Sequence, residues 1–436
     1  MNTVKQILTT KEIRRKMEWM IFIIFIVRFI SMIPVPGIDS SVFQQWMASQ
    51  SNDALNLLSA FTGGSFERFS IFAIGITPLI TAQIIVQLLM SVITPLSKLH
   101  KKGEHGQKII KRITNISAIA LAAIQSCFMA IGLGKSGMIT HNGIWSIILV
   151  TVCMTIGTAI MIWFSEILTK KSIGNGVSIL LMVNIISRMP MDFVELFHDI
   201  TSGKTKMVSV CSVLATIAIV MIIIIVVIYM TEGYHPLHVQ YSQKMSHSGE
   251  SAQTGQIPIK VGISGVMPII FASSVMAFPQ LIASITGKGY GSGFSKIFLN
   301  MMNQENWFNG ENEIYSLGLL IYLALIVFFA FFYLPMTFNG AEVADAIRKN
   351  GGFIPGVRAG EETELYITAI ARRLTAIGVV MLICVTVVPI AICGSFGIHT
   401  KLSGSSIIIV IGVITETLQQ IKLELAGRKY CGLLHR

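Results

Sequence analysis

The chain has 436 residues, of which 53% are hydrophobic and only 13% are charged. Soluble globular proteins carry about 25% charged residues, so this chain lacks the charge that a water-facing surface requires. Its formal net charge is +11, a basic excess that in a soluble protein would indicate nucleic-acid binding. Here the composition indicates an integral membrane protein instead, and the positions of the basic residues become evidence about its topology.

Ten apolar segments are candidates for membrane-spanning helices, each of which needs about 20 mostly apolar residues. They cover residues 19–33, 72–93, 113–133, 144–168, 177–189, 208–230, 263–285, 314–338, 374–392 and 406–423. The first and fifth are short, and the fifth contains Asn184. Residues 1–18 are basic and amphipathic, which is typical of a helix on the membrane surface and not of a cleaved signal peptide. We expect an all-α polytopic membrane protein.

The basic residues lie mostly on one side of this topology. Of the 33 Lys and Arg residues, 24 share a side with both termini and 8 lie on the other, with Arg28 inside the first span. Because cytoplasmic loops are enriched in Lys and Arg, we expect both termini in the cytoplasm. The loops 231–262 and 339–373 and the tail 424–436 would lie on this side.

The number of spans predicts two halves of opposite orientation. Five spans lie within residues 19–190 and five within 208–423, and the segment 191–207 joins them as a hinge loop. An odd number of spans per half is the arrangement of an inverted repeat, which commonly places a pathway at the interface between the halves.

No catalytic or metal-binding motif is complete in this sequence. The run Gly-Lys-Ser at 134–136 lacks the earlier glycine of a phosphate-binding loop. His235 and His238 have no nearby cysteine to complete a metal site. Glu166 and Glu416 lie near span ends, whereas ion-coupled transporters place acids near mid-membrane. We therefore expect no enzyme activity, no cofactor and no bound metal.

The segment 54–93 contains an unusual interruption. A short amphipathic stretch leads into Thr-Gly-Gly-Ser at 62–65, a short helical stretch at 66–74, and then Gly75 and Pro78. Gly75 and Pro78 suit the end of one helix and the start of another. A short helix before such a break must lie against protein or water and not lipid. Either a re-entrant loop at the interface or a segment inside a pathway fits this pattern.

Several motifs, in order along nearly the whole chain, resemble the SecY family, the central subunits of protein-conducting channels. They are Ile-Pro-Val-Pro-Gly-Ile-Asp at 33–39, Phe-Thr-Gly-Gly at 61–64, the runs 70–78 and 84–89, Gly-Asn-Gly at 174–176, Phe-Ala-Ser-Ser at 271–274 and the run 353–361. The resemblance implies an hourglass channel that passes unfolded secretory polypeptides and opens sideways to lipid between the second and seventh spans. The alternatives are a ten-span secondary transporter of a small solute and, third, a structural scaffold.

The resemblance also implies a constriction and a plug. The constriction would be an aliphatic seal around a passing chain, although each residue alone is typical of ordinary helix packing. Its members would be Ile76, Ile80, Val177, Leu181, Ile270 and Ile409. The plug, about 57–70, would fill the outer funnel of the idle channel. Its residues would include Leu57, Ser59, Phe61, Gly63, Gly64, Ser65 and Phe66.

A lateral gate is implied between residues 78–93 and 265–282, with ordinary helix association as the alternative. Its polar contacts would come from Gln83, Gln87, Gln125, Ser273 and Ser274. The loop 339–373 would dock the SecA ATPase or the ribosome. The docking residues would be Arg348, Lys349, Gly356 and Arg358.

The resemblance implies further partners: SecE, a SecG-type subunit, signal peptides, unfolded preproteins and membrane lipids. Ribosome docking is less well supported than the rest. The loop 231–262 contains only Lys244 and Lys260 as basic residues, whereas SecY proteins usually carry a basic cluster there. Ribosomal RNA phosphates are bound largely by Lys and Arg. This departure is compatible with a divergent or accessory copy that serves a restricted partner.

Overall fold

The computed structural model of the chain describes residues 10–49, 59, 61–100, 103–135, 143–201, 218, 221–229, 231–241, 254–263, 265–286, 294–302, 307, 316–358, 360–396 and 404–434. Leu57 of the expected plug, Lys244 and most of the expected sixth span lie outside these residues.

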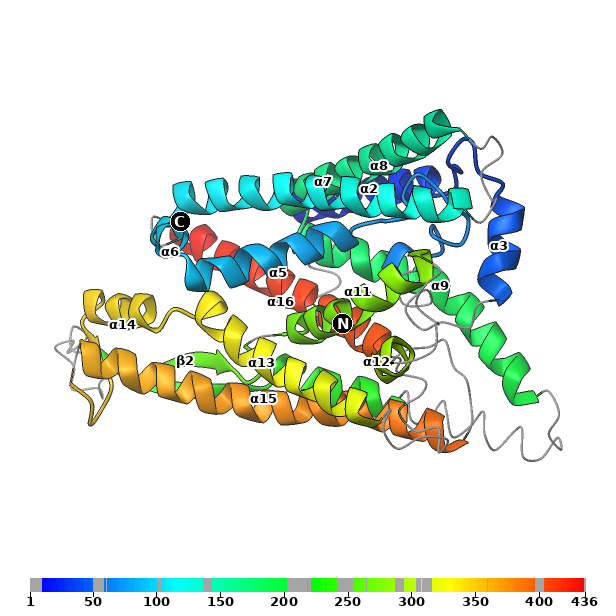
Figure 1. Cartoon of the computed structure of the whole chain (residues 1–436). Helices are drawn as coiled ribbons and strands as arrows, with labels where there is room; N and C mark the ends of the chain where they lie inside the picture. Colours follow the sequence, from blue (N-terminus) through cyan, green and yellow to red (C-terminus); the bar gives the residue numbers. More distant parts are fainter. Residues whose placement is uncertain are drawn as a thin grey trace.

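The N-terminal half is a bundle of long apolar helices (Figure 1). Its elements are α2 (Lys11–Ile30), α3 (Ser40–Ser49), α5 (Thr77–Val92), α6 (Thr94–His100), α7 (Glu104–Lys135), α8 (Ile144–Lys171) and α9 (Gly176–Thr201). In this half α7 packs against both α5 and α8, and α8 packs against α2 and α9.

The C-terminal half combines helices with a small sheet. After a helical stretch at 221–229, its elements are β1 (Tyr234–Tyr241), β2 (Thr254–Lys260), α11 (Met267–Thr286), α12 (Phe294–Met302), α13 (Leu317–Thr337), α14 (Gly340–Lys349), β3 (Gly352–Phe353), α15 (Glu361–Phe396) and α16 (Gly404–Leu434). α11 packs on α5 and α7 as well as on α13 and α16, so it joins the two halves.

The expected membrane-spanning helices are largely present. Within the described residues, five helices are long and apolar enough to cross a membrane, and three shorter apolar helices accompany them. Nine of the ten expected spans coincide with a helix of the described chain, and the sixth is described only in part. The prediction of a mostly helical, multi-pass membrane protein is therefore confirmed.

The structure extends one predicted helix. We expected the fifth span to end at residue 189 and a hinge loop to begin at 191, but α9 continues through Pro190 to Thr201. A proline inside a helix removes one hydrogen bond, and for this reason it is usually taken as a helix end. Helices of membrane proteins tolerate proline because neighbouring groups satisfy the freed carbonyl. Residues 191–201, which we expected in the hinge loop, are therefore helical.

The loops 231–262 and 339–373 contain structure that was not predicted. They form an antiparallel sheet with the strand order β2-β1-β3, and β1 pairs with β2 so that His238 lies opposite Gln256. Leu237 and Val239 point into a core shared with α14 and α15, whereas His238 is exposed. This alternation is typical of a strand with one buried face, so the loop is a folded platform.

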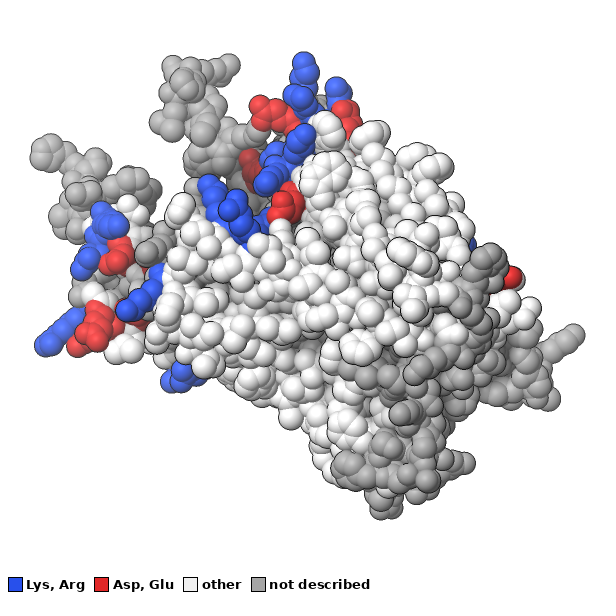
Figure 2. Space-filling view, turned by 45° about the horizontal axis from the view of Figure 1, so that its top comes forward, with Lys and Arg blue, Asp and Glu red and all other residues white. Residues whose placement is uncertain are grey.

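The segments that we assigned to the basic side lie together. Lys16 near the start of α2 forms an ion pair with Glu424 of α16 at 2.6 Å, and Lys422 forms one with Glu232 before β1 at 3.2 Å. Figure 2 shows most of the visible Lys, Arg, Asp and Glu at one end of the molecule, beside a broad surface without charge, and a smaller charged spot at the opposite edge. The charge pattern thus separates one polar end from an apolar surface, as a chain surrounded by a bilayer requires.

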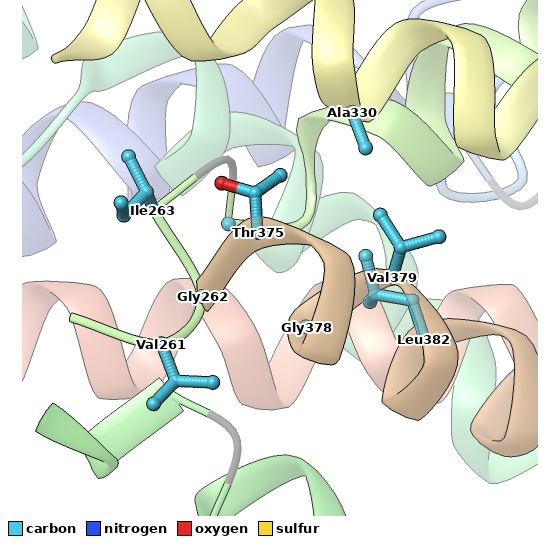
Figure 3. A pocket seen from close by; sticks show the side chains of 9 residues that line it. Val261, Gly262, Ile263, Ala330, Thr375, Gly378, Val379 and Leu382 are labelled. Atoms are coloured by element: carbon cyan, nitrogen blue, oxygen red, sulfur yellow. The ribbon is translucent and has the colours of Figure 1, made fainter. Parts of the chain in front are cut away.

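The platform is joined tightly to the bundle (Figure 3). Residues 261–263 connect β2 to α11 and pack on α15, where a Cβ at Gly378 would lie 2.9 Å from the carbonyl oxygen of Val261. Apolar side chains, including Val379 and Leu382, enclose a cavity of only about 10 Å³ beside this contact. Such close packing transmits displacement instead of absorbing it. The start of α11 is therefore positioned by α15.

Candidate functional site

Six aliphatic side chains from four parts of the bundle belong to one buried cluster, which we call the neck. They are Ile76 just before α5, Ile80 in α5, Val177 and Leu181 in α9, Ile270 in α11 and Ile409 in α16. None is more than 9% exposed. Because α5 and α9 belong to one half and α11 and α16 to the other, the neck lies where the two halves meet. All six residues expected at the constriction therefore lie in this one buried cluster, together with many other apolar residues of both halves.

Residues 63–76 form turns and bends, with a single bridge residue at Ser70, whereas we expected a short helix at 66–74. Gly63, Gly64 and Gly75 have φ values of +65°, +78° and +62°, and Phe69 has φ +46°. Repeated left-handed residues cannot continue a right-handed helix of L-amino acids. The break at Gly75 is confirmed, because α5 begins at Thr77 with Pro78 in its first turn.

The described residues of the expected plug, 59 and 61–70, contact buried clusters on two sides, and we call these residues the plug. Ser59, Phe61, Ser65 and Phe66 are all buried, and Phe61 belongs to the same cluster as the neck. Phe66 belongs to a second cluster formed with α7 and α8. Its backbone is also anchored, since the amide of Val35 donates to the carbonyl of Phe69 at 2.9 Å. The plug is therefore packed between the neck and an outer apolar layer.

Helix α3 supports the outer side of the plug. Its Phe43 ring meets the Phe66 ring edge to face, with ring centroids 5.5 Å apart. The helix starts beside Asp39, whose carboxylate accepts hydrogen bonds from the hydroxyl of Ser41 at 2.6 Å and from its amide at 3.0 Å. The Ser41 hydroxyl, followed by its amide, lowers the pKa of Asp39, so this carboxylate stays ionised at the helix start.

Two polar side chains of the spanning helices cradle the inner side of the plug. Asn184 of α9 donates to the carbonyl of Phe61 at 2.7 Å. Arg28 of α2 donates to Asn184 Oδ1 and to the carbonyl of Val183, each at 2.8 Å, and more weakly to the carbonyl of Gly63 at 3.4 Å. A Cβ at Gly63 would lie 2.6 Å from Arg28 Nη1, so only glycine permits this approach.

The roles of Arg28 and Asn184 were not predicted from the sequence. Arg28 served only in the charge count, and Asn184 only as a residue out of place in a span. A usable signal was nevertheless present, because polar residues inside membrane spans are rare and usually mark a functional contact. What the sequence could not supply was the partner, which lies on a distant segment.

A cavity of about 600 Å³, which we call the vestibule, reaches the neck at Val177. Helices of both halves line it, and Lys111, Glu166 and Glu416 are among its charged residues. Its neutral amide side chains are Gln83, Gln87, Gln107, Asn115, Asn175 and Gln420. Amides both donate and accept hydrogen bonds, as a peptide backbone does. The vestibule can therefore contact an extended polypeptide of any sequence.

The seam between α5 and α11 shows few polar contacts. Gln83 and Gln87 line the vestibule, while Ser273 donates to the carbonyl of Ile270 within its own helix at 3.0 Å. Gln87 Oε1 and Ser274 Oγ are buried and have no hydrogen-bond partner among the described residues. Gln125 on α7 is half-buried. The expected hydrogen bonds across the seam are thus not formed in the described structure, and apolar packing joins the two helices.

Comparison with known proteins assigns these features to a family. The SecY family model matches residues 70–418. Protein translocase subunit SecY of Staphylococcus aureus is 31% identical over 437 aligned residues, which cover 99% of this chain and 98% of that protein. The same values hold for its counterpart in Staphylococcus epidermidis. The chain belongs to the SecY family.

Solved SecY and Sec61 structures have the same fold as this SecY-family chain. A structure described as a protein conducting channel matches with a TM-score of 0.66 and 16% identity. Sec61 in the canine ribosome-channel complex from the endoplasmic reticulum matches with a TM-score of 0.64 and the same identity. Both matches cover 94% of this chain and 92% of the other.

The four expected docking residues of this SecY-family chain lie on or beside the platform. Arg348 and Lys349 are exposed at the end of α14, and Arg348 pairs with Asp345 at 3.1 Å. Such exposed pairs contribute little stability, so Arg348 can exchange partners. Gly356 has φ +83° and Arg358 is exposed. The backbone carbonyl of Arg358 accepts a hydrogen bond from the hydroxyl of Thr363 at 2.7 Å.

Proposed function

We propose that this chain is the channel subunit of a protein translocase, through which unfolded secretory polypeptides cross the cell membrane. One observation carries the proposal. Val177 belongs to both the vestibule and the neck, and Phe61 of the plug packs in the same buried cluster as the neck residues. An apolar constriction that a packed segment covers would stay closed at rest and would open when a polypeptide displaces that segment.

The neck explains how such a channel could be unselective and yet sealed. Its aliphatic side chains can close around any polypeptide because they offer no hydrogen bond or charge to recognise. A narrow apolar constriction also resists wetting, which limits the leak of ions. A small-solute transporter would instead need polar groups at its binding site, and the six neck residues provide none.

The seam between α5 and α11 would serve as the lateral gate. Apolar contacts join these helices. Gln87 Oε1 and Ser274 Oγ are buried and have no hydrogen-bond partner among the described residues. Leaving buried polar groups without partners weakens an interface. Separation of α5 from α11 would let a transmembrane segment pass from the pathway into lipid, and would give the two polar atoms access to water or to the passing chain.

The platform and the charged end would face the cytoplasm, with both termini on that side. Energy would come from the SecA ATPase or from ribosomal synthesis, because the channel itself would be passive. SecE and a SecG-type subunit would bind within the membrane. We favour SecA at Arg358 over the ribosome, because the loop 231–262 offers only two basic residues to RNA phosphates. One of them, Lys260, already donates a hydrogen bond to Gln419 of α16 at 2.5 Å.

Depletion of the chain followed by quantification of secreted proteins tests this function. If the proposal is right, signal-bearing proteins accumulate inside the cell, either all of them or a dedicated subset. Vesicles that contain the purified chain and its partner subunits should take up a preprotein only with SecA and ATP. Saturable uptake of a small solute without any motor, and an unchanged set of secreted proteins, would contradict the proposal.

A further inference from the structure

Arg188 of α9 contacts two separate parts of the plug. Its Nη1 atom donates a hydrogen bond to the hydroxyl of Ser59 and forms an ion pair with Glu67 Oε1 at 2.5 Å. Ser59 precedes the glycine turns of the plug and Glu67 follows them. One guanidinium group therefore ties the two ends of these turns to the same point of a spanning helix.

The surroundings make this contact stronger than an ordinary surface ion pair. The side chain of Arg188 is 7% exposed and that of Glu67 is 33% exposed, while Ser59 is fully buried. Attraction between charges increases as water is excluded from around them. Removing one partner of a buried pair is costly because it leaves the other charge uncompensated. The position of the plug should therefore depend on Glu67.

Arg28 contacts the plug in a different way. Its short hydrogen bonds go to Val183 and Asn184, which belong to α9, and its bond to the plug is the long one to the Gly63 carbonyl. Arg28 can stay bound to α9 when the plug moves. Arg188 cannot keep Ser59 and Glu67, since both residues belong to the moving segment. Opening must therefore break the contacts of Arg188 with Ser59 and Glu67.

We propose that Arg188 is a positioning residue that sets how readily the plug leaves the neck, and that its ion pair with Glu67 is the contact that opening breaks. The inference rests on the proposed channel function and adds to it a specific contact that keeps the channel closed. A weaker pair would shift the resting channel toward the open state. A translocating chain with a poor signal would then open it more easily.

The test measures the resting leak of chloride from phosphatidylethanolamine and phosphatidylglycerol vesicles that contain the full chain with its partner subunits. Glu67→Gln keeps the size and hydrogen bonding of the side chain but removes its charge. It should raise the resting leak about tenfold, equivalent to about 1.4 kcal/mol. Arg188→Lys keeps the charge and should raise the leak less. Arg68→Gln alters the exposed neighbour of Glu67 and is the matched control with an unchanged leak.

A charge reversal separates positioning from general destabilisation. Arg188→Glu alone should leak strongly. Adding Glu67→Arg should lower the leak most of the way to that of the unaltered chain, because the two residues are coupled. The amount of inserted chain is measured for each variant. Rescue would not occur if Arg188 only supported the fold. A double variant that leaks as much as Arg188→Glu alone would overturn the proposal.

Deletion of residues 61–69 distinguishes this inference from the channel proposal. If the deletion raises the leak while Glu67→Gln leaks no more than Arg68→Gln, the channel and its plug stand and the role of Arg188 is wrong. If the deletion leaves the vesicles sealed and no preprotein enters with SecA and ATP, the proposed function itself is wrong and the inference is wrong with it.

Discussion

Arg28 on α2 donates a hydrogen bond to the side-chain oxygen of Asn184 on α9 at 2.8 Å, and Asn184 donates in turn to the plug at the carbonyl of Phe61. One amide thus connects the first span, the fifth span and the plug. The side chain uses its oxygen as an acceptor and its NH₂ group as a donor, both of which an amide provides. Asn184 is only 2% exposed, so water cannot replace either contact.

Replacing Asn184 with leucine should destabilise the closed protein. Asn184→Leu leaves the Phe61 carbonyl and part of the Arg28 guanidinium without a partner, and each such loss costs about 1–3 kcal/mol. The melting temperature of the purified chain in detergent should fall. Ser187→Ala is the control, because among the described residues the exposed Ser187 hydroxyl bonds only to the Asn184 carbonyl of its own helix. Equal melting temperatures for both variants would count against the cradle.

Polar substitutions in the neck should loosen the seal. Ile76→Asn and Ile270→Asn each bury a polar group in an apolar cluster, at a cost of about 1–3 kcal/mol to the closed state. Export of a reporter with a defective signal sequence should rise, because less energy is then needed to open the neck. Ile76→Val keeps the apolar surface and should behave like the unaltered chain. If the asparagine variants remain as selective as Ile76→Val, the neck is not the seal.

Cysteines placed across the seam should report its opening. In a chain whose own cysteines are replaced, Gln87→Cys and Ser274→Cys should form a disulfide in the idle state, because α5 packs against α11. Export should stop in the oxidised protein and resume on reduction. Ile85→Cys with Ser274→Cys is the matched pair, since Ile85 is on the exposed face of α5 and should not cross-link. Unimpaired export through the oxidised seam would exclude it as the gate.

Reversing the charge of Arg358 should impair motor-driven export without loss of the inserted protein. Arg358 is exposed and its side chain is available to a partner, so Arg358→Glu should weaken docking of SecA and leave the fold intact. Preprotein uptake into vesicles would be measured with SecA and ATP. Arg14→Glu makes the same charge change at an exposed position of α2 outside the platform. Equal uptake by both variants would show that docking occurs elsewhere.

The plug also depends on a glycine that has no polar role. A Cβ on residue 157 of α8 would overlap the carbonyl oxygen of Ile71, so the plug is held, through the residue that directly follows it, on the bare backbone of Gly157. Gly157→Ala should cost about 1–3 kcal/mol through overpacking and lower the melting temperature. Val152→Ala on the exposed face of the same helix should have little effect. A Gly157→Ala protein as stable as the unaltered chain would mean that the plug does not seat there.

Helix positions could be predicted because the bilayer imposes a simple requirement on each span. About 20 apolar residues are needed whatever surrounds them, and this pattern is visible in α7, α8 and α13 without any partner. The break before α5 was also predictable, since glycine and proline act locally at Gly75 and Pro78. The path of α9 through Pro190 was not, because tolerance of a proline depends on neighbouring groups.

Composition along the chain was enough to predict the class of protein and most of its spans. These properties follow from local composition. Only the tertiary structure decided that Arg28, Asn184 and Arg188 bind the plug, and that two loops form one platform. Arg188 and Ser59 are 129 positions apart. The partner of a buried charge is chosen by which distant segment packs beside it, and no local pattern encodes that choice.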